Sequence, residues 1–368
     1  MKMNSAKIES EFQIAMRNFR LNKLAMVCVL VLGILYAAAV FADFLSPYSY
    51  KNEDRRFSYC PPTRVHLFDG GRLSRPFVYG ISLTYNEFHQ RIYKEDRSVK
   101  FPLRIFMKGD SYHLLGFIPW DIHFWGVEEA GRVYLLGADS RGRDLFSRLL
   151  YGSRVSLSIG LIGVAISFTI GLLIGGISGY YGGRIDNLLM RLAELVMMVP
   201  GFYLLLALRA AVPVTFNSLQ VYIAIIVILS FIGWAGLARI IRGMCLSLRE
   251  REFILAARSC GLSDLKIIVK HILPHTLSYS IFAVMLSIPG YILGESALSL
   301  IGLGIQDPYA SWGNMLSDAM SIVRIKFCPW ILWPGFLIFL TVISFNVIGD
   351  TLRDCLDPML RFEGEKKK

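Results

Sequence analysis

The sequence predicts an all-α polytopic membrane protein with six transmembrane helices and a small, partly β insertion between the first two helices. Apolar residues make up 54% of the 368 residues, and the mean hydropathy is +0.49. These residues occur in long runs without charge, and a bilayer-spanning helix needs roughly 20 mostly apolar residues. Between the first two runs lies a long polar stretch, in which turn residues separate strand-like segments.

Each predicted span is a run with little or no charge. The third run is the shortest, and Pro200 and Gly201 interrupt it. A membrane helix tolerates such a break when a neighbouring helix covers the freed backbone groups. For the first run, a cleaved signal peptide is the alternative, but 19 uncharged residues exceed a usual signal core and favour retention. The six runs are 24–42, 155–183, 195–208, a stretch within 210–238, 274–294 and 327–349.

Lysine and arginine predict the orientation of the spans. If the N-terminus is cytoplasmic, the inner segments 1–23, 184–191, 239–270 and 353–368 carry five, two, seven and five of these residues. The short outer segments 213–219 and 304–326 then carry none and two. This asymmetry predicts that both termini are cytoplasmic, in a multi-pass protein of the cell inner membrane. The net charge of +11 therefore indicates cytoplasmic loops, with no nucleic-acid partner.

Residues 46–131 are expected to form the extracytoplasmic insertion. Strand-like runs such as "RPFVYGISLTY" alternate there with turn residues. A docking surface is favoured over a simple lid, because long loops in compact folds are usually functional. The remaining parts are the N-terminal segment with the first helix at 1–45, the membrane domain at 132–361 and a basic cytoplasmic tail at 362–368. Cys60 and Cys328 would share the outer compartment, where they either pair or stay free.

The segment "EFILAARSCGLSDLKIIVKHILP", residues 252–274, is too charged to span the membrane. Gly261 fits a left-handed position that ends one helix, Ser263 can cap the next, and Pro274 suits the start of a further helix. Two apolar stripes are expected on these helices, the first with Phe253, Ile254, Ala257 and Gly261 and the second with Leu265, Ile268, Val269 and Ile272. Such a unit either lies on lipid or enters a groove on a cytoplasmic partner. The small residues favour a protein contact.

This segment also resembles the "EAA" loop of ABC importer permeases. The resemblance rests on Ala256, Ala257, Gly261 and the sequence from His271 to Pro274, although Leu255 stands where the family usually has Glu. Further stretches resemble the second (C-type) permease of the oligopeptide/dipeptide (peptide/nickel) branch, and 46–131 matches no part of it. These stretches are "RNFRLNKLAM" (17–26), "LLGADSRGRDLFSRLLYGSRVSL" (135–157), "GYYGGRIDNLLMRL" (179–192), "ESALSLIGLGIQDPYASWGNML" (295–316) and "FNVIGDTLRDCLDPMLR" (345–361).

The resemblance implies an ABC importer type I-like permease that takes up peptides together with a homologous permease, two ATPase subunits and an extracytoplasmic solute-binding protein. ATP and Mg would be bound by the ATPases, and this chain has no P-loop motif, so it is expected to bind no cofactor and to be no enzyme. Peptide-like antibiotics, nickel complexes and glycosides are the alternative solutes. The ATPase-coupling residues implied are Glu252, Phe253, Ile254, Ala256, Ala257, Gly261, Leu262, Asp264, Leu265, His271 and Pro274, within a coupling loop at 244–274.

Charged residues near the predicted span ends are further candidates. Arg209 and Glu295 are candidates for the translocation path, because charges in membranes usually face a cavity. Snorkelling of Arg209 and a structural role of Glu295 are the stronger alternatives. The set Asp139, Arg141, Arg143 and Asp144 is expected to form mutual salt bridges or, second, to contact the binding protein.

Other functional classes lack support in the sequence. His271 and His275 have metal-ligand spacing, but no third ligand is near, so no metal site is expected. A secondary transporter predicts internal repeats and broken helices with midplane charges, and a membrane enzyme predicts clustered catalytic residues. Gly171, Gly175 and Gly179 have small-xxx-small spacing, which predicts close packing within this chain or against the partner permease.

Overall fold

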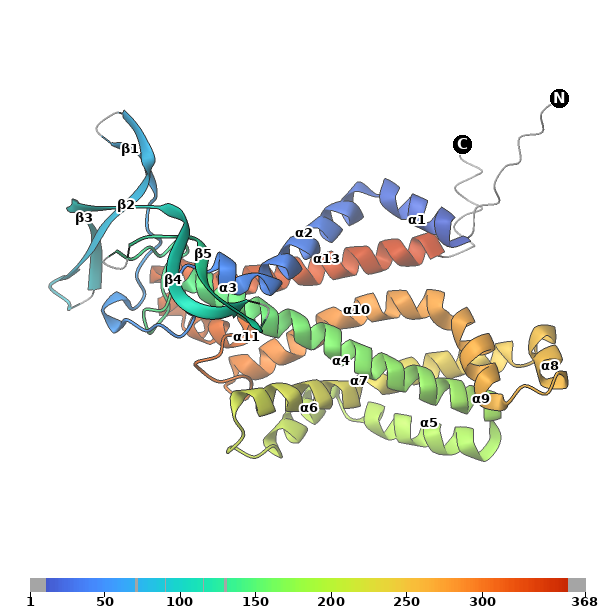
Figure 1. The fold of residues 1–368 in the computed structure, drawn as a ribbon. Coiled ribbons are helices and arrows are strands. Elements are labelled where there is room, and N and C mark those ends of the chain that lie inside the picture. Colours follow the sequence, from blue (N-terminus) through green and yellow to red (C-terminus); the bar gives the residue numbers. More distant parts are fainter. Residues whose placement is uncertain (1–10, 70–71, 90, 115, 129–130, 357–368) are drawn as a thin grey trace, which may run out of the picture.

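The computed structural model describes residues 11–356, except 70–71, 90, 115 and 129–130. Figure 1 shows an elongated helical bundle with β-strands at one end, here called the insertion end. The short helices α8 and α9 lie at the opposite end. The predicted basic tail at 362–368 lies outside the described residues.

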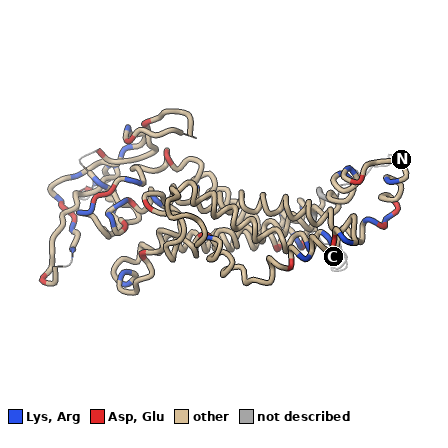
Figure 2. Tube along the Cα trace, turned by 90° about the horizontal axis from the view of Figure 1, so that it is seen from below, with Lys and Arg blue, Asp and Glu red and all other residues tan. Residues whose placement is uncertain are grey.

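Five described helices are long and apolar enough to cross a membrane. They are α2 (Lys23–Val40), α4 (Leu145–Tyr181), α7 (Ser218–Leu248), α10 (Leu273–Leu300) and α13 (Trp333–Leu356). Charged residues gather at the two ends of the molecule and leave the middle of the bundle nearly free of charge (Figure 2). This distribution matches a bilayer around the middle, where isolated charges are costly.

The third predicted span differs from a straight helix. α5 (Gly183–Met198) and α6 (Gly201–Ala210) meet at an angle of 88°. The break follows Val199, directly at Pro200, whose ring is incompatible with an uninterrupted helix. Residues 184–191, expected as a loop, are instead helical in α5, because buried Asp186, Met190 and Ala193 recur with helical spacing.

α4 packs along α7 through its small residues. A Cβ on Gly175 would lie 2.5 Å from the backbone oxygen of Ala238, and one on Gly179 would lie 2.5 Å from the Cβ of Cys245. Both distances are far below van der Waals contact, so glycine is required for this approach. The small-residue stripe therefore packs within this chain, as one of its two interpretations predicted.

The insertion is partly β, as expected. β1 (His66–Asp69), β2 (Arg72–Tyr85) and β3 (Arg91–Pro102) form one antiparallel sheet, and β4 (Arg104–Leu114) with β5 (Ile118–Gly126) forms a hairpin. The strands follow α3 (Ala42–Leu45), which continues from the end of α2. Cys60 is buried and Cys328 half-buried, and both are free thiols.

Short elements complete the described chain. They are α1 (Glu11–Leu21), α8 (Glu252–Ser259), α9 (Asp264–Ile267), α11 (Trp312–Met315), α12 (Ile322–Phe327), a π-helical turn (Ile268–Ile272) and the 3-10 turns Arg55–Phe57, Leu316–Met320 and Pro329–Leu332.

Candidate functional site

The segment 252–274 forms the helix, glycine turn and helix that the sequence predicts. α8 ends before Gly261, which has a φ of 75° in the left-handed region. α9 and the π-helical turn follow, and Pro274 lies in the first turn of α10. Ser263 is the N-cap residue of α9, but its side chain makes no cap hydrogen bond. The cap position was therefore predicted correctly and its capping interaction was not.

Six apolar side chains fix this segment to the bundle. They pack with Tyr180 of α4 and with Ile241 and Cys245 of α7. The six are Ile254, Ala257, Ile267, Ile268, Ile272 and Leu273. The predicted stripes included Ile254, Ala257, Ile268 and Ile272, but they also included Phe253, Gly261, Leu265 and Val269, which are exposed. The π-helical turn changes which residues share a face, because it has more residues per turn than an α-helix.

Four exposed apolar side chains remain on this segment, and we call them the 252–274 surface. They are Phe253, Leu255, Leu265 and Val269. Leu265 is the most exposed, at 61%. Of the other sequence-predicted coupling residues, Glu252, Ala256, Gly261, Asp264 and Pro274 are exposed, and Leu262 and His271 are half-buried. The segment thus ends the molecule with four exposed large apolar side chains among exposed charged ones such as Arg258, Lys266 and Lys270.

A polar contact joins the same segment to the end of α4. The Tyr180 hydroxyl donates a hydrogen bond of 2.7 Å to Asp264 Oδ1. The Arg258 guanidinium lies 5.3 Å from the centre of the Tyr180 ring, within cation–π range. Tyr180 is buried. One tyrosine at the last turn of α4 therefore contacts both helices of the segment.

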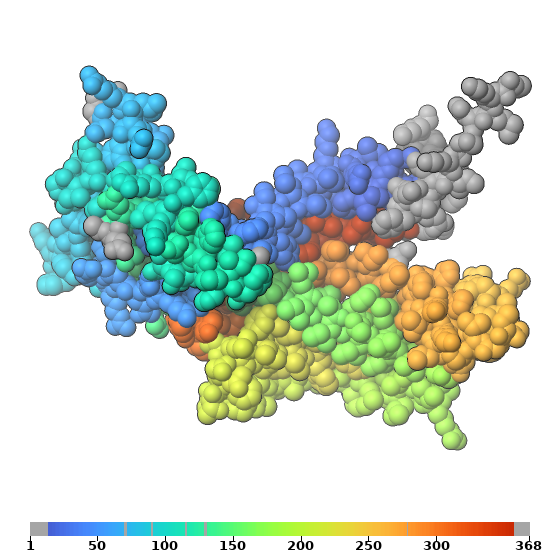
Figure 3. Space-filling view, viewed as in Figure 1, coloured from blue at the N-terminus to red at the C-terminus, as the bar shows by residue number. Residues whose placement is uncertain are grey.

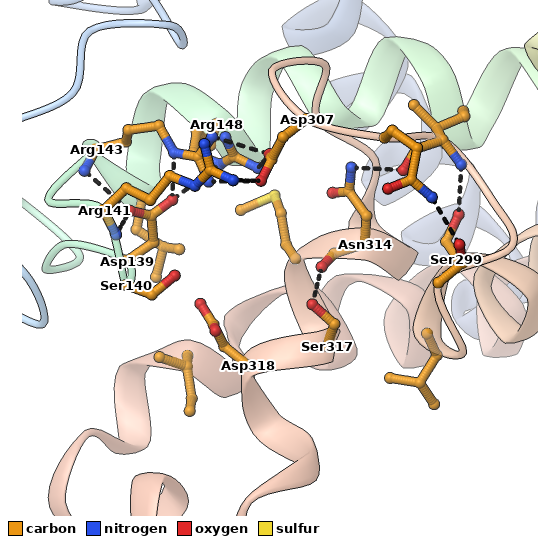
Figure 4. A pocket seen from close by; sticks show the side chains of 17 residues that line it. Asp139, Ser140, Arg141, Arg143, Arg148, Ser299, Asp307, Asn314, Ser317 and Asp318 are labelled. Atoms are coloured by element: carbon orange, nitrogen blue, oxygen red, sulfur yellow. Dashed lines mark hydrogen bonds and ion pairs between the residues drawn. The ribbon is translucent and has the colours of Figure 1, made fainter. Parts of the chain in front are cut away.

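At the insertion end, charged side chains from three parts of the chain form what we call the Arg143 cluster: Glu53, Asp139, Arg141, Arg143, Arg148 and Asp307. Arg143 Nε donates to Asp139 Oδ2 at 2.7 Å, and Arg143 Nη1 donates to Asp307 Oδ1 at 2.9 Å. Arg148 Nη2 also donates to Asp307 Oδ1, at 3.3 Å. Figure 4 shows the three arginines converging on Asp139 and Asp307, next to a cavity of about 240 Å³.

The exposed side of the cluster involves Arg141. Its Nη1 donates to Glu53 Oε1 at 3.0 Å, and its Nη2 lies 3.2 Å from Asp307 Oδ2. The side chain of Arg141 is 43% exposed, compared with 4% for Arg143. The predicted mutual salt bridge between Asp139 and Arg143 is confirmed.

The pKa values of two carboxyl groups, Asp307 in this cluster and Asp144 next to it in the sequence, are shifted in opposite directions. Burial raises the pKa of Asp307, but the hydrogen bond from Arg143 and the charges of Arg148, Arg143 and Arg141 outweigh burial and hold this pKa below its usual range. Asp144 is buried, and desolvation raises its pKa to about 6. Its Oδ2 nevertheless accepts hydrogen bonds from the Ser147 N–H and hydroxyl, at 2.8 and 2.6 Å, and so caps α4.

Burial reduces the number of predicted residues that could contact a binding protein. Asp139, Arg143 and Asp144 are buried, so their side chains are not available to another protein in this structure. Arg141 is the exposed member of the predicted set. The sequence analysis missed Glu53, Arg148 and Asp307 as partners. Arg143 and Asp307 are 164 positions apart in the sequence, so no local pattern indicated their contact.

Arg209 and Glu295 occupy different surroundings. Glu295 is fully buried, and its Oε1 accepts a hydrogen bond of 2.6 Å from the Ser299 hydroxyl. Ser156 Oγ donates to the other oxygen at 3.4 Å and accepts a hydrogen bond from the Trp312 N–H. Glu295 therefore links α10 to α4 and, through Ser156, to α11. These contacts agree with the structural role that was its stronger alternative, and its place in a translocation path stays a prediction. Arg209 is buried too, and its Nε donates to the Leu303 backbone oxygen at 2.5 Å.

Comparison with protein families identifies the kind of protein that carries these features. Residues 171–362 match the family model "Binding-protein-dependent transport system inner membrane component", and residues 10–62 match "N-terminal TM domain of oligopeptide transport permease C". The chain belongs to this binding-protein-dependent permease family. It is thus a membrane-spanning subunit of a transport system, and the resemblance stated from the sequence is confirmed.

Individual permeases align over most of the chain. The dipeptide transport system permease protein DppC of Bacillus subtilis is 32% identical over 95% of this chain and 86% of its own length. The oligopeptide permease OppC of the same organism is 30% identical over 97% and 92% of the two chains. OppC of Haemophilus influenzae is 43% identical over 65% and 78%. Among solved structures, a chain of the MetNI methionine ABC transporter covers 57% of this chain at 17% identity, with a TM-score of 0.43.

Proposed function

We propose that this permease takes up oligopeptides or dipeptides as one of two membrane-spanning subunits of an ATP-driven importer. The observation that carries the proposal is the near full-length similarity to permeases named for dipeptide and oligopeptide transport. Another solute, such as a peptide-like antibiotic, a nickel complex or a glycoside, is the second candidate. The chain itself is a transport subunit without catalytic activity.

The 252–274 surface is the proposed docking site for an ATPase subunit. Four large apolar side chains are exposed there on a base of six buried ones. Covering such side chains with a partner is favourable, at roughly 25 cal/mol per Å² of apolar area. A short helix that enters a groove is a common mode of recognition. Two ATPases, which bind ATP and Mg, would dock on this permease and on a homologous one.

The proposed topology counts α5 and α6 together as one span, which gives six spans in all. Both termini and the 252–274 segment would lie in the cytoplasm, and the insertion would lie outside. The excess of Lys and Arg in the segments at the α8 end supports this orientation. The exposed Arg141 and the cavity beside it would then face an extracytoplasmic solute-binding protein.

The proposed mechanism is alternating access. ATP brings the two ATPases together, and the segments 252–274 of the two permeases follow. The Tyr180 contacts with Asp264 and Arg258 would pass this movement to α4. Such coupling requires that the segment makes different contacts with the ATPase in the two states.

Co-purification from mild detergent tests the docking site. Leu265→Glu places a charge on the proposed contact without disturbing a buried residue, so the ATPase should be lost while the second permease is retained. The matched control is Val323→Glu in α12, which is 65% exposed at the opposite end of the molecule. Retention of the ATPase by Leu265→Glu at the wild-type level would contradict the assignment.

Uptake into proteoliposomes that contain the assembled importer tests the substrate class. A labelled dipeptide or oligopeptide should accumulate only with ATP and with the binding protein. Unlabelled peptides should compete, whereas nickel complexes and glycosides should not. Competition by a glycoside or a nickel complex, but not by peptides, would favour the second candidate.

A further inference from the structure

The β4–β5 hairpin carries apolar side chains where a hairpin in water usually carries polar ones. Its turn contains Gly116, with a φ of 86°. Phe117 follows and is 71% exposed, and Ile118 and Trp120 are exposed on β5. Turns in water favour Gly, Asn, Asp, Ser and Pro. The exposed Phe117 and Ile118 therefore indicate that the tip of this hairpin meets an apolar environment.

The tip lies against the two neighbouring membrane helices. Gly116 lines an apolar cavity together with residues of α2 and α4, which are Tyr36, Ala39, Val40, Arg154, Leu157, Ser158 and Leu161. In Figure 3 the teal atoms of the hairpin reach from the insertion to the junction of blue α2 and green α4. The tip thus turns towards the bundle.

The depth of this contact follows from α2. Its apolar window of 18 residues ends at Val40. At 1.5 Å per residue the window spans about 27 Å, close to the ~30 Å of a hydrocarbon core. The end of α2 at Val40 is therefore expected close to the hydrocarbon boundary at the insertion end. Leu157 and Leu161, which line the same cavity, continue into the apolar part of α4.

Arg154 marks the same boundary. Its Nε donates to the Ala39 backbone oxygen at 2.6 Å, and its Nη2 donates to Asp43 Oδ2 at 2.6 Å. The guanidinium is thus held at the end of α2, while the arginine stem lines the apolar cavity. This is how an arginine snorkels at a membrane interface. Trp120 of the hairpin is exposed, and exposed tryptophan is typical of an interfacial aromatic belt.

The base of the hairpin is fixed to the end of α2. Phe44 of α3 packs against Phe106 and Phe124, with ring centres 6.2 and 5.7 Å apart. The buried His123 is within hydrogen-bond distance of two backbone oxygens, at 2.5 Å from that of Ser46 and 3.0 Å from that of Asp110. These contacts hold the tip beside the spans.

We propose that the β4–β5 hairpin inserts Phe117 and Ile118 among the lipid acyl chains of the bilayer leaflet at the insertion end. The occupant is lipid because the tip is continuous with apolar side chains that α2 and α4 already expose, such as Ile34, Val40 and Leu161. The hairpin anchors the insertion to the membrane surface and fixes its orientation. This goes beyond the transport function and does not depend on the substrate.

Spin labelling of the assembled importer in lipid nanodiscs tests the proposal. Phe117→Cys is labelled in a background with Cys260→Ser, Cys328→Ser and Cys355→Ser. The matched control is Phe88→Cys, because Phe88 is 80% exposed near the turn of the β2–β3 hairpin. That hairpin ends away from the bundle (Figure 1). Both substitutions affect exposed side chains, so the fold should be retained.

Collision of the label with oxygen, which enters bilayers, is compared with collision with a water-soluble nickel chelate. The ratio of oxygen to nickel accessibility should be several-fold higher at position 117 than at position 88. Equal ratios at the two positions would place the tip in water and overturn the proposal. Low accessibility to both reagents at position 117 would mean that another protein covers the tip, which would overturn it as well.

Discussion

The two ends of the molecule differ in whether their prominent side chains find partners within the chain. At the insertion end, the charges of the Arg143 cluster are neutralised within the chain, and Arg143 itself is buried between Asp139 and Asp307. At the other end, the 252–274 surface leaves four apolar side chains uncovered. The ion pairs of the first end thus form within this chain, whereas the apolar side chains of the 252–274 surface stay exposed in the described part of the chain.

α4 connects these two ends. Arg148, near its start, belongs to the Arg143 cluster, and Tyr180, near its end, contacts the 252–274 segment. The helix has 37 residues, which corresponds to about 55 Å. A disturbance of the Arg143 cluster should therefore reduce the stability of the whole subunit, while changes at the 252–274 segment should remain local.

The largest effect is expected from Arg143→Met. This change leaves Asp139 and the partly buried Asp307 without their main cation, and removing one partner of a buried ion pair costs about 3–5 kcal/mol. Thermal unfolding in detergent measures the loss. The control is Arg141→Met, whose exposed pairs should contribute only about 0–1 kcal/mol. Equal losses in the two variants would show that burial does not determine the strength of these pairs.

Glycine turns at the two ends provide a second comparison. Gly142 and Gly261 both have a φ of 75°. A left-handed conformation costs a non-glycine residue roughly 1–2 kcal/mol, so Gly261→Ala should lose about that much. At Gly142 a Cβ would also collide with the backbone oxygen of Asp54, whereas at Gly261 it would meet open space.

Gly142→Ala should therefore destabilise the protein more than Gly261→Ala, by about 1–3 kcal/mol of additional packing strain. Thermal unfolding of both variants checks the order. A larger loss for Gly261→Ala would contradict the comparison, because it would mean that the exposed turn matters more for folding than the buried one.

The sequence predicted features of the two ends unequally, depending on whether local or distant residues determine them. Gly261 and Pro274 were predictable, because local backbone rules govern a left-handed turn and a helix start. The break at Pro200 followed from the same kind of rule. The partners of Arg143 were only half predictable: Asp139 is four residues away, but Asp307 approaches through the folding of distant segments.

Packing also decided which apolar residues are buried. Leu265 of α9 and Val269 of the π-helical turn follow the expected helical spacing, but both are exposed. Glu295 was matched as part of a motif, and its partner Ser299 lies four residues later on the same helix, at helical spacing. Its other partner, Ser156, comes from α4, and no periodicity in the sequence indicates that contact.

A pH dependence should arise from Asp144 at the insertion end. Burial raises its pKa to about 6, so the folded protein binds more protons than the unfolded chain between about pH 4 and 6. The contribution of Asp144 to stability therefore falls as the pH rises through this window and is constant above it. Asp307 has a lowered pKa, and its own contribution is lost only at lower pH, as the pH falls through that value.

Asp144→Asn keeps an oxygen that can accept the Ser147 N–H and removes the charge. Its stability relative to wild type should increase by about 1–3 kcal/mol between pH 4 and pH 7. Thermal unfolding across this range measures the difference. If the two curves stay parallel, Asp144 is not the group that titrates.

The smallest effect is expected at the opposite end, for Tyr180→Phe. The substitution removes the hydrogen bond to Asp264 and keeps the buried ring, so the midpoint of unfolding should hardly change. A hydrogen bond contributes about 1 kcal/mol, and its loss should speed hydrogen exchange in α8 and α9 about fivefold. The control is Tyr181→Phe, at an exposed neighbouring position. Unchanged exchange in both variants would mean that the six buried apolar side chains alone fix the segment, and that the hydroxyl does not connect it to α4.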